Sequence, residues 1–265
     1  MKRVVVMCAV LVLAGCSDDA PTAVGGSTSS SAAQATELTV FAGSSLTTAF
    51  EALAVDFEAE HPGVTVTFNF GPSDGLAAQI DSEGGADVFA SASQTWMDDV
   101  EDKTGVTGRA DFVTNKLVVI TPPDDPAGIS SLEDLAAEGV QVVLAAEGVP
   151  VGDYARESLQ SAGIDDTVLK NVVSNAEDDA AVVATITSGE ADAGIVYASD
   201  VTSEVAPEVQ AIEIPDDVNV TATYPIAVVQ DAADAELAQA WIDFVTTGEG
   251  QERLVSEFGF LPAAG

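Results

Sequence analysis

Basic residues are scarce in this chain: 8 of its 265 residues are Lys or Arg, 44 are Asp or Glu, and the formal net charge is −36. A field of that sign repels DNA, RNA and anionic lipid surfaces, so the composition excludes a protein that tracks phosphate backbones. Histidine and cysteine are also rare, with one histidine, His61, and two cysteines. The chain therefore has no His/Cys cluster for zinc and, apart from His61, no histidine base for a nucleophile.

Apolar residues, in contrast, are plentiful. They make up 47% of the chain, which is enough for a core and excludes a disordered acidic chain. The length suits one large domain or two lobes of ordinary size. His61 stands before Pro62-Gly63 at the end of a helical pattern, which favours a helix cap or a solvent-facing side chain over catalysis.

The start of the chain has the pattern of an export signal. Lys2 and Arg3 precede an apolar run over residues 4–13 that is too short to span a bilayer and ends in small residues. We therefore predict that residues 1–15 are a signal peptide that is removed. The ending Leu-Ala-Gly-Cys at 13–16 resembles the bacterial lipobox, which implies cleavage before Cys16 and a lipid on its thiol. An ordinary signal peptide with an accidental cysteine is the alternative.

Residues 16–36 have the composition of a linker. They contain Pro, Gly and a Ser/Thr run but almost no bulky apolar side chain, which predicts a flexible tether. The folded part is expected to begin near Glu37. The protein is thus predicted to be exported and held at the outer face of the cell membrane through a lipid on Cys16 alone.

From Glu37 onward, short β-branched runs alternate with helical patterns. Strands are predicted over 38–41, 64–70, 86–90, 117–120, 141–144, 194–197, 209–214 and 226–229. Helices are predicted over 46–57, through Leu76 and Ile80, from a capping box of Ser130 and Glu133 to 138, and over 154–161, 179–188, 235–245 and 250–258. This alternation indicates an α/β fold with mostly parallel sheets, in which ligands bind at the carboxyl ends of strands.

Four of the strand-to-helix turns, 42–47, 70–75, 147–154 and 175–179, could form a binding site together with Tyr197, which ends a strand. Hydroxyls and the unpaired N–H groups of helix N-termini bind an anion without a basic side chain. No basic residue lies in the turns of Ser45, Ser73 or Tyr197, and only Arg156 stands near a candidate turn. The sequence therefore predicts an oxyanion site without charge pairing. An ordinary N-cap is the alternative for each serine.

A set of longer motifs makes a resemblance specific. Their order and spacing match over essentially all of residues 37–262, and they are TVFAGSSLT (39–47), LAAQI (76–80), GADVFASA (85–92), VPVGDYA (149–155), GEADAGIVY (189–197) and YPIAVV (224–229). The sequence resembles the periplasmic molybdate-binding proteins of ABC transporters. The resemblance implies a two-lobed periplasmic-binding-protein fold of type II, in which each lobe is a mixed, mostly parallel sheet flanked by helices and the hinge consists of crossing strands.

On this chain the expected lobes are discontinuous. We predict lobe 1 over residues 37–116 plus 223–265 and lobe 2 over residues 117–222. Two crossings between them would form a hinge that permits closure on a ligand.

The resemblance also implies the ligand and its donors. The protein would bind one molybdate or tungstate through neutral hydrogen bonds, with hydroxyls of Ser45, Ser73 and Tyr197 and backbone amides of Ser45, Ser73, Val151 and Asp179. It would need no cofactor, catalyse no reaction, act as a monomer and deliver the oxyanion to an ABC permease.

The fourth turn departs from the family pattern because it reads Asp178-Asp179-Ala180. A carboxylate that faces a dianion in a poorly solvated cleft is unfavourable, so we expect Asp179 to contribute its N–H while its side chain caps the helix or faces solvent. A metal-ligating carboxylate, another oxyanion or a small organic acid remain alternatives, as does an enzyme that uses Asp153 with Asp179. Trp96 and Met97 are expected to pack within their lobe and not to touch the ligand.

Overall fold

The computed structural model describes residues 36–263; the predicted signal peptide, Cys16 and the linker up to residue 35 lie outside the described residues. Ten strands occur in the described part. They are β1 (Thr36–Gly43), β2 (Val64–Gly71), β3 (Val88–Ala90), β4 (Val106–Thr121), β5 (Val142–Ala145), β6 (Val172–Ala176), β7 (Ala193–Tyr197), β8 (Gln210–Glu213), β9 (Thr221–Val229) and β10 (Leu261–Pro262).

Helices alternate with these strands. The α-helices are α1 (Thr47–Glu60), α2 (Ser73–Glu83), α3 (Gln94–Lys103), α4 (Pro150–Ser161), α5 (Asp165–Asn171), α6 (Asp179–Thr187), α7 (Ala235–Thr246) and α8 (Gly248–Ser256). Three short 3₁₀ helices, η1 (Ser44–Leu46), η2 (Glu133–Ala136) and η3 (Ala198–Asp200), complete the described elements. Among residues 36–263, no helix has the length and apolar character that crossing a membrane requires.

The strands follow the order β2-β1-β3-β9-β4-β7-β5-β6, and β8 and β10 also pair with β4. Pairs β1–β2, β1–β3, β5–β6 and β5–β7 are parallel. Every pair that involves β4 or β9 is antiparallel. The predicted α/β class with mixed sheets is therefore confirmed, and parallel pairing is confined to the strands on either side of the two long central ones.

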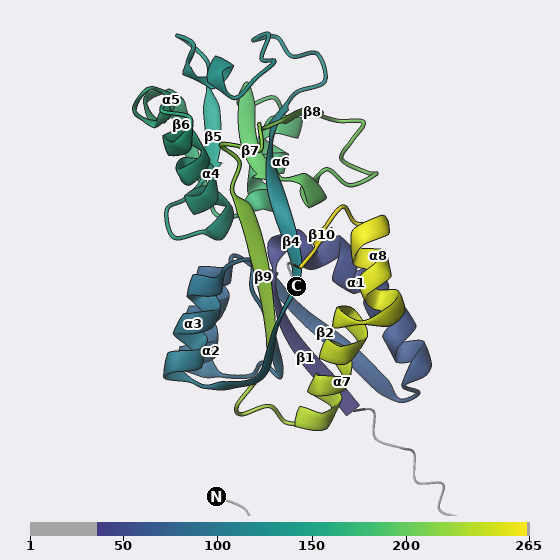
Figure 1. Cartoon of the computed structure of the whole chain (residues 1–265). Coiled ribbons are helices and arrows are strands. Elements are labelled where there is room, and N and C mark those ends of the chain that lie inside the picture. Colours follow the sequence, from purple (N-terminus) through teal and green to yellow (C-terminus); the bar gives the residue numbers. More distant parts are fainter. Residues whose placement is uncertain (1–35, 264–265) are drawn as a thin grey trace, which may run out of the picture. The chain divides into compact units, whose positions relative to one another are not determined.

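Strand β4 links the two parts of the sheet. Its residues 106–116 pair with β9, whereas residues 117–121 pair with β7 and β8 (Figure 1). The change of partner falls between Lys116 and Leu117, where the sequence places the first lobe boundary. The division into lobes itself stays a prediction, because all described residues lie within one compact unit.

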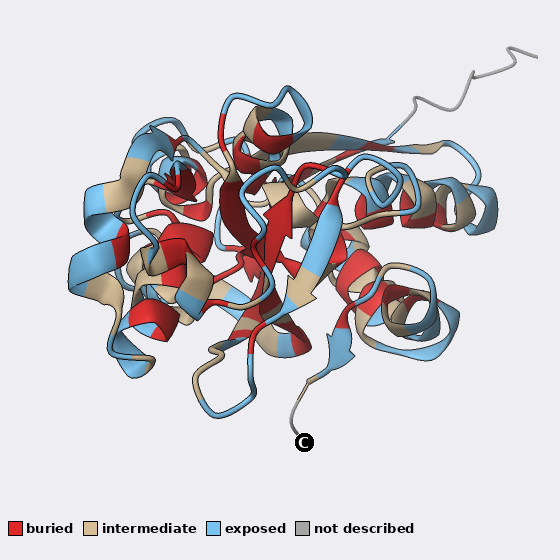
Figure 2. Cartoon of the chain, turned by 90° about the horizontal axis from the view of Figure 1, so that it is seen from above, coloured by how far each residue is buried: buried red, intermediate tan, exposed pale blue. Residues whose placement is uncertain are grey.

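Helices cover both faces of the sheet around β1. Helices α2 and α3 lie on one face and α1, α7 and α8 on the other (Figure 1). Successive side chains of a strand point to opposite faces of the sheet, so each strand contributes to both cores. Val40 and Val88 belong to the larger core cluster, whereas Phe41 and Phe89 belong to the cluster under α2 and α3. Figure 2 shows the result, with buried strands between helices whose outer sides are exposed.

Several predicted elements differ in extent. The predicted helix over 130–138 is wrong: only the short η2 forms, and Ser130 bonds Asp134, not Glu133. Helix α4 begins at Pro150 because proline suits the first helical turn. The sequence analysis missed α3, α5, β10 and the first half of β4, and it gave no range for β6, the strand it expected before the turn at 175–179. The first half of β4 contains Gly108 and polar residues and shifts register twice against β9, so its strand pattern is interrupted.

The prediction for His61 is confirmed, and Trp241 packs against the same helix, α1. His61 caps α1, since its backbone N–H donates to the Phe57 carbonyl and its ring stacks on the Phe57 ring. Trp241 is fully buried and packs edge-on against Phe50 and Phe57, with ring centroids 5.4 and 5.2 Å away.

Candidate functional site

A small cavity lies where the carboxyl ends of several strands meet. Its lining consists of Gly43, Ser44, Ser45, Gly71, Pro72, Ser73, Ala92, Val149, Pro150, Val151, Asp179 and Tyr197. These residues end or follow β1, β2, β3, β5, β6 and β7, as expected for ligand sites in α/β sheets. All five residues that the sequence analysis selected, Ser45, Ser73, Val151, Asp179 and Tyr197, are brought together here.

Three helices direct their N-terminal ends at the cavity. Ser73 and Asp179 are the first residues of α2 and α6, and Val151 is the second residue of α4. The N–H groups of a first helical turn have no partner within the helix, and they carry partial positive charge. The cavity is therefore surrounded by backbone donors.

Gly152 allows α4 to approach the end of β5 closely. A Cβ atom at this position would lie 2.4 Å from the carbonyl oxygen of Ala146 and 2.5 Å from that of Ala145. Only glycine fits such a contact without a shift of the backbone. This close packing places the N–H of Val151 at the cavity.

The two serines are not helix caps. Helices η1 and α2 have no side-chain cap hydrogen bond. The Ser73 hydroxyl accepts a hydrogen bond from the Ala92 N–H at 3.0 Å, and Ser73 is 1% exposed. The Ser45 hydroxyl pairs with the Tyr224 hydroxyl at 2.9 Å. The N-cap alternative is therefore wrong for both residues.

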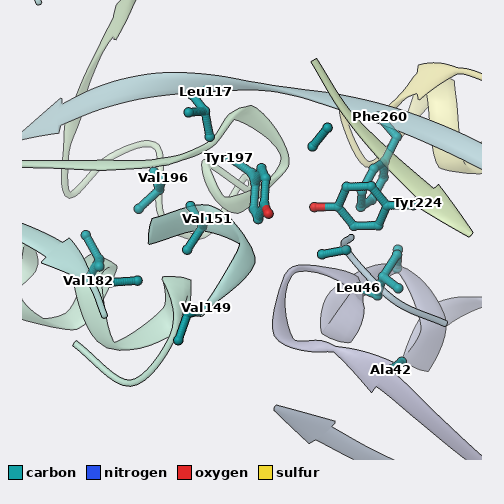
Figure 3. Close-up of a cluster of buried hydrophobic side chains, with 14 of the residues drawn as sticks. Ala42, Leu46, Leu117, Val149, Val151, Val182, Val196, Tyr197, Tyr224 and Phe260 are labelled. Atoms are coloured by element: carbon teal, nitrogen blue, oxygen red, sulfur yellow. The ribbon is translucent and has the colours of Figure 1, made fainter. Parts of the chain in front are cut away.

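Tyr197 provides a buried hydroxyl with no partner. The side chain is 1% exposed, and its oxygen makes no hydrogen bond among the described residues. Its ring packs edge-on to that of Tyr224, with centroids 5.7 Å apart, and Figure 3 shows the Tyr224 hydroxyl directed toward Tyr197. Burial raises the pKa of both phenols well above the ordinary value, so both hydroxyls keep their protons. A buried hydroxyl without a hydrogen-bond partner is unfavourable, which indicates that a ligand accepts its hydrogen bond.

Tyr224 belongs to a chain of hydrogen bonds that ends at the cavity. Asn115 donates through Nδ2 to the Ser199 hydroxyl at 2.8 Å and to the Tyr224 hydroxyl at 3.4 Å. If Tyr224 in turn donates to Ser45, the Ser45 proton is free for a group in the cavity. Asn115 is 0% exposed, so this network is shielded from water.

The Asp179 side chain contradicts its prediction. It neither caps α6 nor faces solvent: Asp178 is the cap, accepting from the Ala181 N–H at 2.8 Å, and Asp179 is 4% exposed. The Asp179 carboxyl instead accepts a hydrogen bond from the Ser44 hydroxyl. The cap position falls one residue earlier than expected, which turns the next side chain inward toward η1.

Burial raises the pKa of the Asp179 carboxyl, although the Ser44 hydrogen bond opposes this effect. A second carboxyl, Asp200, lies beside it. Burial and the Asp179 charge raise the pKa of Asp200 well above the ordinary carboxyl value. Asp200 also accepts from the Tyr197 N–H at 2.9 Å, which holds the end of β7 in place.

No basic side chain lines the cavity, as predicted. Arg156 donates to the carbonyls of Ala145 and Gly152 at 2.8 and 2.7 Å and to Asn175 at 2.9 Å, so its charge supports β5 and α4. Within residues 36–263, no group of three or more His, Cys, Asp or Glu side chains is arranged to hold a metal ion. The site offers neutral donors only.

Other candidate residues take different places. Asp153 does not line the cavity, and its carboxylate accepts from the Gly148 N–H at 2.9 Å. Met97 is buried in the core under α2 and α3, as predicted. Trp96 is half-buried, packs against the same cluster and does not line the cavity, as predicted. Its indole N–H donates to the Gly148 carbonyl at 2.8 Å.

The sequence analysis did not select three residues that shape the site: Ser44, Asp200 and Tyr224. All three stand inside or next to motifs that it quoted, beside Ser45, after Tyr197 and at the start of YPIAVV. Ser44 bonds Asp179, which is 135 residues away in the sequence, and Tyr224 bonds Ser45, which is 179 residues away. No local sequence pattern identifies such partners.

The cavity is small. The empty space among its lining atoms is about 190 Å³. Pockets for drug-sized ligands have about 300–1,000 Å³. The site therefore suits one compact species and leaves no room for a sugar or a peptide.

Known proteins are similar to this chain in sequence and in fold. The family described as bacterial extracellular solute-binding protein matches residues 38–261. The molybdate-binding protein ModA of Mycobacterium tuberculosis is 34% identical over 227 residues, which cover 85% of this chain and 85% of that protein. ModA of Escherichia coli is 34% identical over 232 residues, which cover 84% of this chain and 88% of that protein.

Solved structures agree at the level of the fold. The periplasmic molybdate-binding protein of Azotobacter vinelandii superposes with a TM-score of 0.75 at 19% identity, covering 86% of this chain and all of that one. The chain therefore belongs to the bacterial extracellular solute-binding proteins, in the family of the molybdate-binding proteins.

Proposed function

We propose that this protein captures a single molybdate or tungstate ion in the cavity and delivers it to an ABC permease. The observation that carries the proposal is the Tyr197 hydroxyl, which is 1% exposed and has no partner in the described part of the chain. It lies in the same cavity as the N-terminal ends of α2, α4 and α6. A tetrahedral oxyanion would supply acceptors for all of these donors at once.

The donors would act as follows. The hydroxyls of Ser45, Ser73 and Tyr197 and the backbone N–H groups of Ser45, Ser73, Val151 and Asp179 would bind the oxyanion. The Ser73 hydroxyl already accepts from Ala92, so its own proton is available to a ligand oxygen. Hydrogen bonds to a charged acceptor are roughly twice as strong as neutral ones, which lets an uncharged cage hold an anion.

Selectivity would come from size and from protonation. A cage of neutral donors does not discriminate among similar dianions by charge, so the volume of the cavity would separate molybdate and tungstate from the smaller sulfate. A protonated phosphate would turn its P–OH toward a donor, which is unfavourable. The small volume of the cavity argues against an extended organic acid.

Catalysis is not part of the proposal. The relatives are molybdate-binding proteins. The alternative of an acid and base pair formed by Asp153 and Asp179 loses support, because Asp153 is engaged with Gly148 and does not line the cavity. We infer that the protein needs no cofactor.

The cellular setting is also proposed from the family and the sequence. We infer an exported monomer that is anchored to the outer face of the membrane by a lipid on Cys16 and tethered by residues 16–36. Lobes over 37–116 plus 223–265 and over 117–222 would close on the ion about β4 and β9. The hydrogen bond of Trp96 with Gly148 supports contact between these parts.

Isothermal titration calorimetry with molybdate, tungstate, sulfate and phosphate at fixed salt tests the proposal. We expect tight one-to-one binding of molybdate and tungstate and little or no heat with sulfate. Absence of heat with both metal oxyanions, from protein that is folded by circular dichroism, would overturn it. Binding of sulfate in their place would move the assignment to another oxyanion.

A further inference from the structure

Two carboxyl groups from separate elements meet beside the cavity without a basic partner. Asp179 begins α6, and Asp200 ends η3 after the last residue of β7. The two carboxyl groups lie beside each other and line one hollow. Adjacent carboxyl groups form a hydrogen bond to each other only when one of them holds a proton, because a carboxylate has none to donate. Each carboxyl also accepts a hydrogen bond from another residue: Ser44 donates to Asp179, and the Tyr197 N–H donates to Asp200.

The groups that face this pair supply no positive charge. Asp178 precedes it on the same element, and Tyr197 and Tyr224 face it from β7 and β9. Strands β5 and β6, which also pack against α6, contain no ionisable side chain. Strand β4 packs against α6 too, and its two cations, Arg109 and Lys116, form ion pairs with other acidic residues. Burial therefore favours the neutral form of the pair, and a nearby anion would favour it further.

The pair also lies at the border of two hollows. Ser44, Ser45 and Asp179 line the candidate binding cavity and a second, more open hollow that Asp200 and Glu204 line as well. A proton can thus reach the pair from the solvent side while the oxyanion occupies the other side. Glu204 adds another acidic group to that route.

We propose that Asp179 and Asp200 hold one shared proton when the cavity contains its oxyanion, so that the dianion and a proton bind together. The inference rests on the proposed function. The proton comes from solvent and lies between one oxygen of each carboxyl, so the pair carries one negative charge in place of two. The Ser44 hydroxyl in η1 donates a hydrogen bond to the Asp179 carboxyl and so stabilises the negative charge that remains on the pair.

A pH dependence with a definite sign follows. The bound protein carries more protons than the free protein wherever the free pair is ionised, so the affinity for the dianion falls as the pH rises. Linkage limits the effect to one proton, which is about tenfold in affinity per pH unit. The pKa of both carboxyls is raised by burial, which extends this range above the ordinary carboxyl values.

Calorimetry counts the proton directly. Molybdate is titrated into wild-type protein at about pH 8, where exposed carboxyls are ionised, in buffers of different ionisation enthalpy. The slope of the observed enthalpy against the buffer enthalpy gives the protons taken up. The test variant is Asp179→Asn, whose amide does not titrate. The matched control is Asp153→Asn, because Asp153 is also an acid in the first turn of a helix but does not line the cavity.

We expect wild-type and Asp153→Asn protein to take up a fraction of a proton approaching one per molybdate, and Asp179→Asn to take up none and to lose the pH dependence. Molybdate binding to wild-type protein without uptake, or equal uptake by Asp179→Asn, would overturn the inference and leave the proposed function standing. Absence of molybdate binding to folded wild-type protein would remove both. The wild-type count decides by itself where a variant does not fold.

Discussion

Replacing Tyr197 by Phe tests the binding proposal at a single atom. The substitution removes one hydroxyl that is buried and has no partner in residues 36–263, and it leaves the ring in place. A hydrogen bond to a charged group contributes about 1.5–3 kcal/mol. We therefore expect the affinity for molybdate to fall by about 10- to 150-fold. The ligand-free protein should be as stable as wild type or more stable by up to about 1–3 kcal/mol, because an unsatisfied buried group disappears.

The matched control is Tyr224→Phe. Its hydroxyl has partners, Ser45 at 2.9 Å and Asn115 at 3.4 Å, so its loss should destabilise the ligand-free protein by about 0.5–1.5 kcal/mol. Calorimetry with molybdate and urea unfolding without ligand measure both quantities for both variants. Wild-type affinity in Tyr197→Phe, or a stability loss as large as that of Tyr224→Phe, would refute the assignment of the hydroxyl to a ligand.

Three further substitutions probe how the site is built. Ser73→Ala leaves the buried N–H of Ala92 without its acceptor, so urea unfolding should show a loss of about 1–3 kcal/mol and calorimetry a weaker binding of molybdate; unchanged values for both would contradict the assigned hydrogen bond. Gly152→Ala forces a Cβ against the carbonyls that end β5, and we expect a loss of about 1–3 kcal/mol in unfolding free energy together with weaker binding, whereas a neutral result would mean that α4 moves freely. Trp96→Phe removes the donor to Gly148 and should reduce the molybdate affinity by up to about tenfold and abolish most of the ligand-induced change in tryptophan fluorescence; a full signal from this variant would assign the change to another residue.

Local patterns predicted the elements around the site well. The strand, turn and helix over 38–57 appear as β1, η1 and α1, because β-branched and helical periodicities are strong there. The same holds for β7 and α6. The first half of β4 was missed, since its Gly108 and alternating polar residues hide a strand whose stability comes from pairing with β9, more than 100 residues later.

The resemblance to molybdate-binding proteins placed the five selected residues in one cavity, but it did not predict the direction of every side chain. Asp179 was expected to cap its helix or to face solvent. Its actual partners, Ser44 and Asp200, come from other parts of the chain, and Asp178 takes the cap. A local rule for helix caps therefore identified the right turn and the wrong residue.

The sequence by itself determined the kinds of group at the site and their order along the chain. Scarce basic residues exclude charge pairing, and serines and glycines at strand-to-helix turns provide neutral donors at helix N-termini. Only the tertiary structure decided which donors are already satisfied. The Ser45 hydroxyl meets Tyr224, the Asp179 carboxyl is buried beside Asp200, and the Tyr197 hydroxyl is left without a partner. These outcomes depend on contacts between residues far apart in the chain, which local periodicity and propensity do not encode.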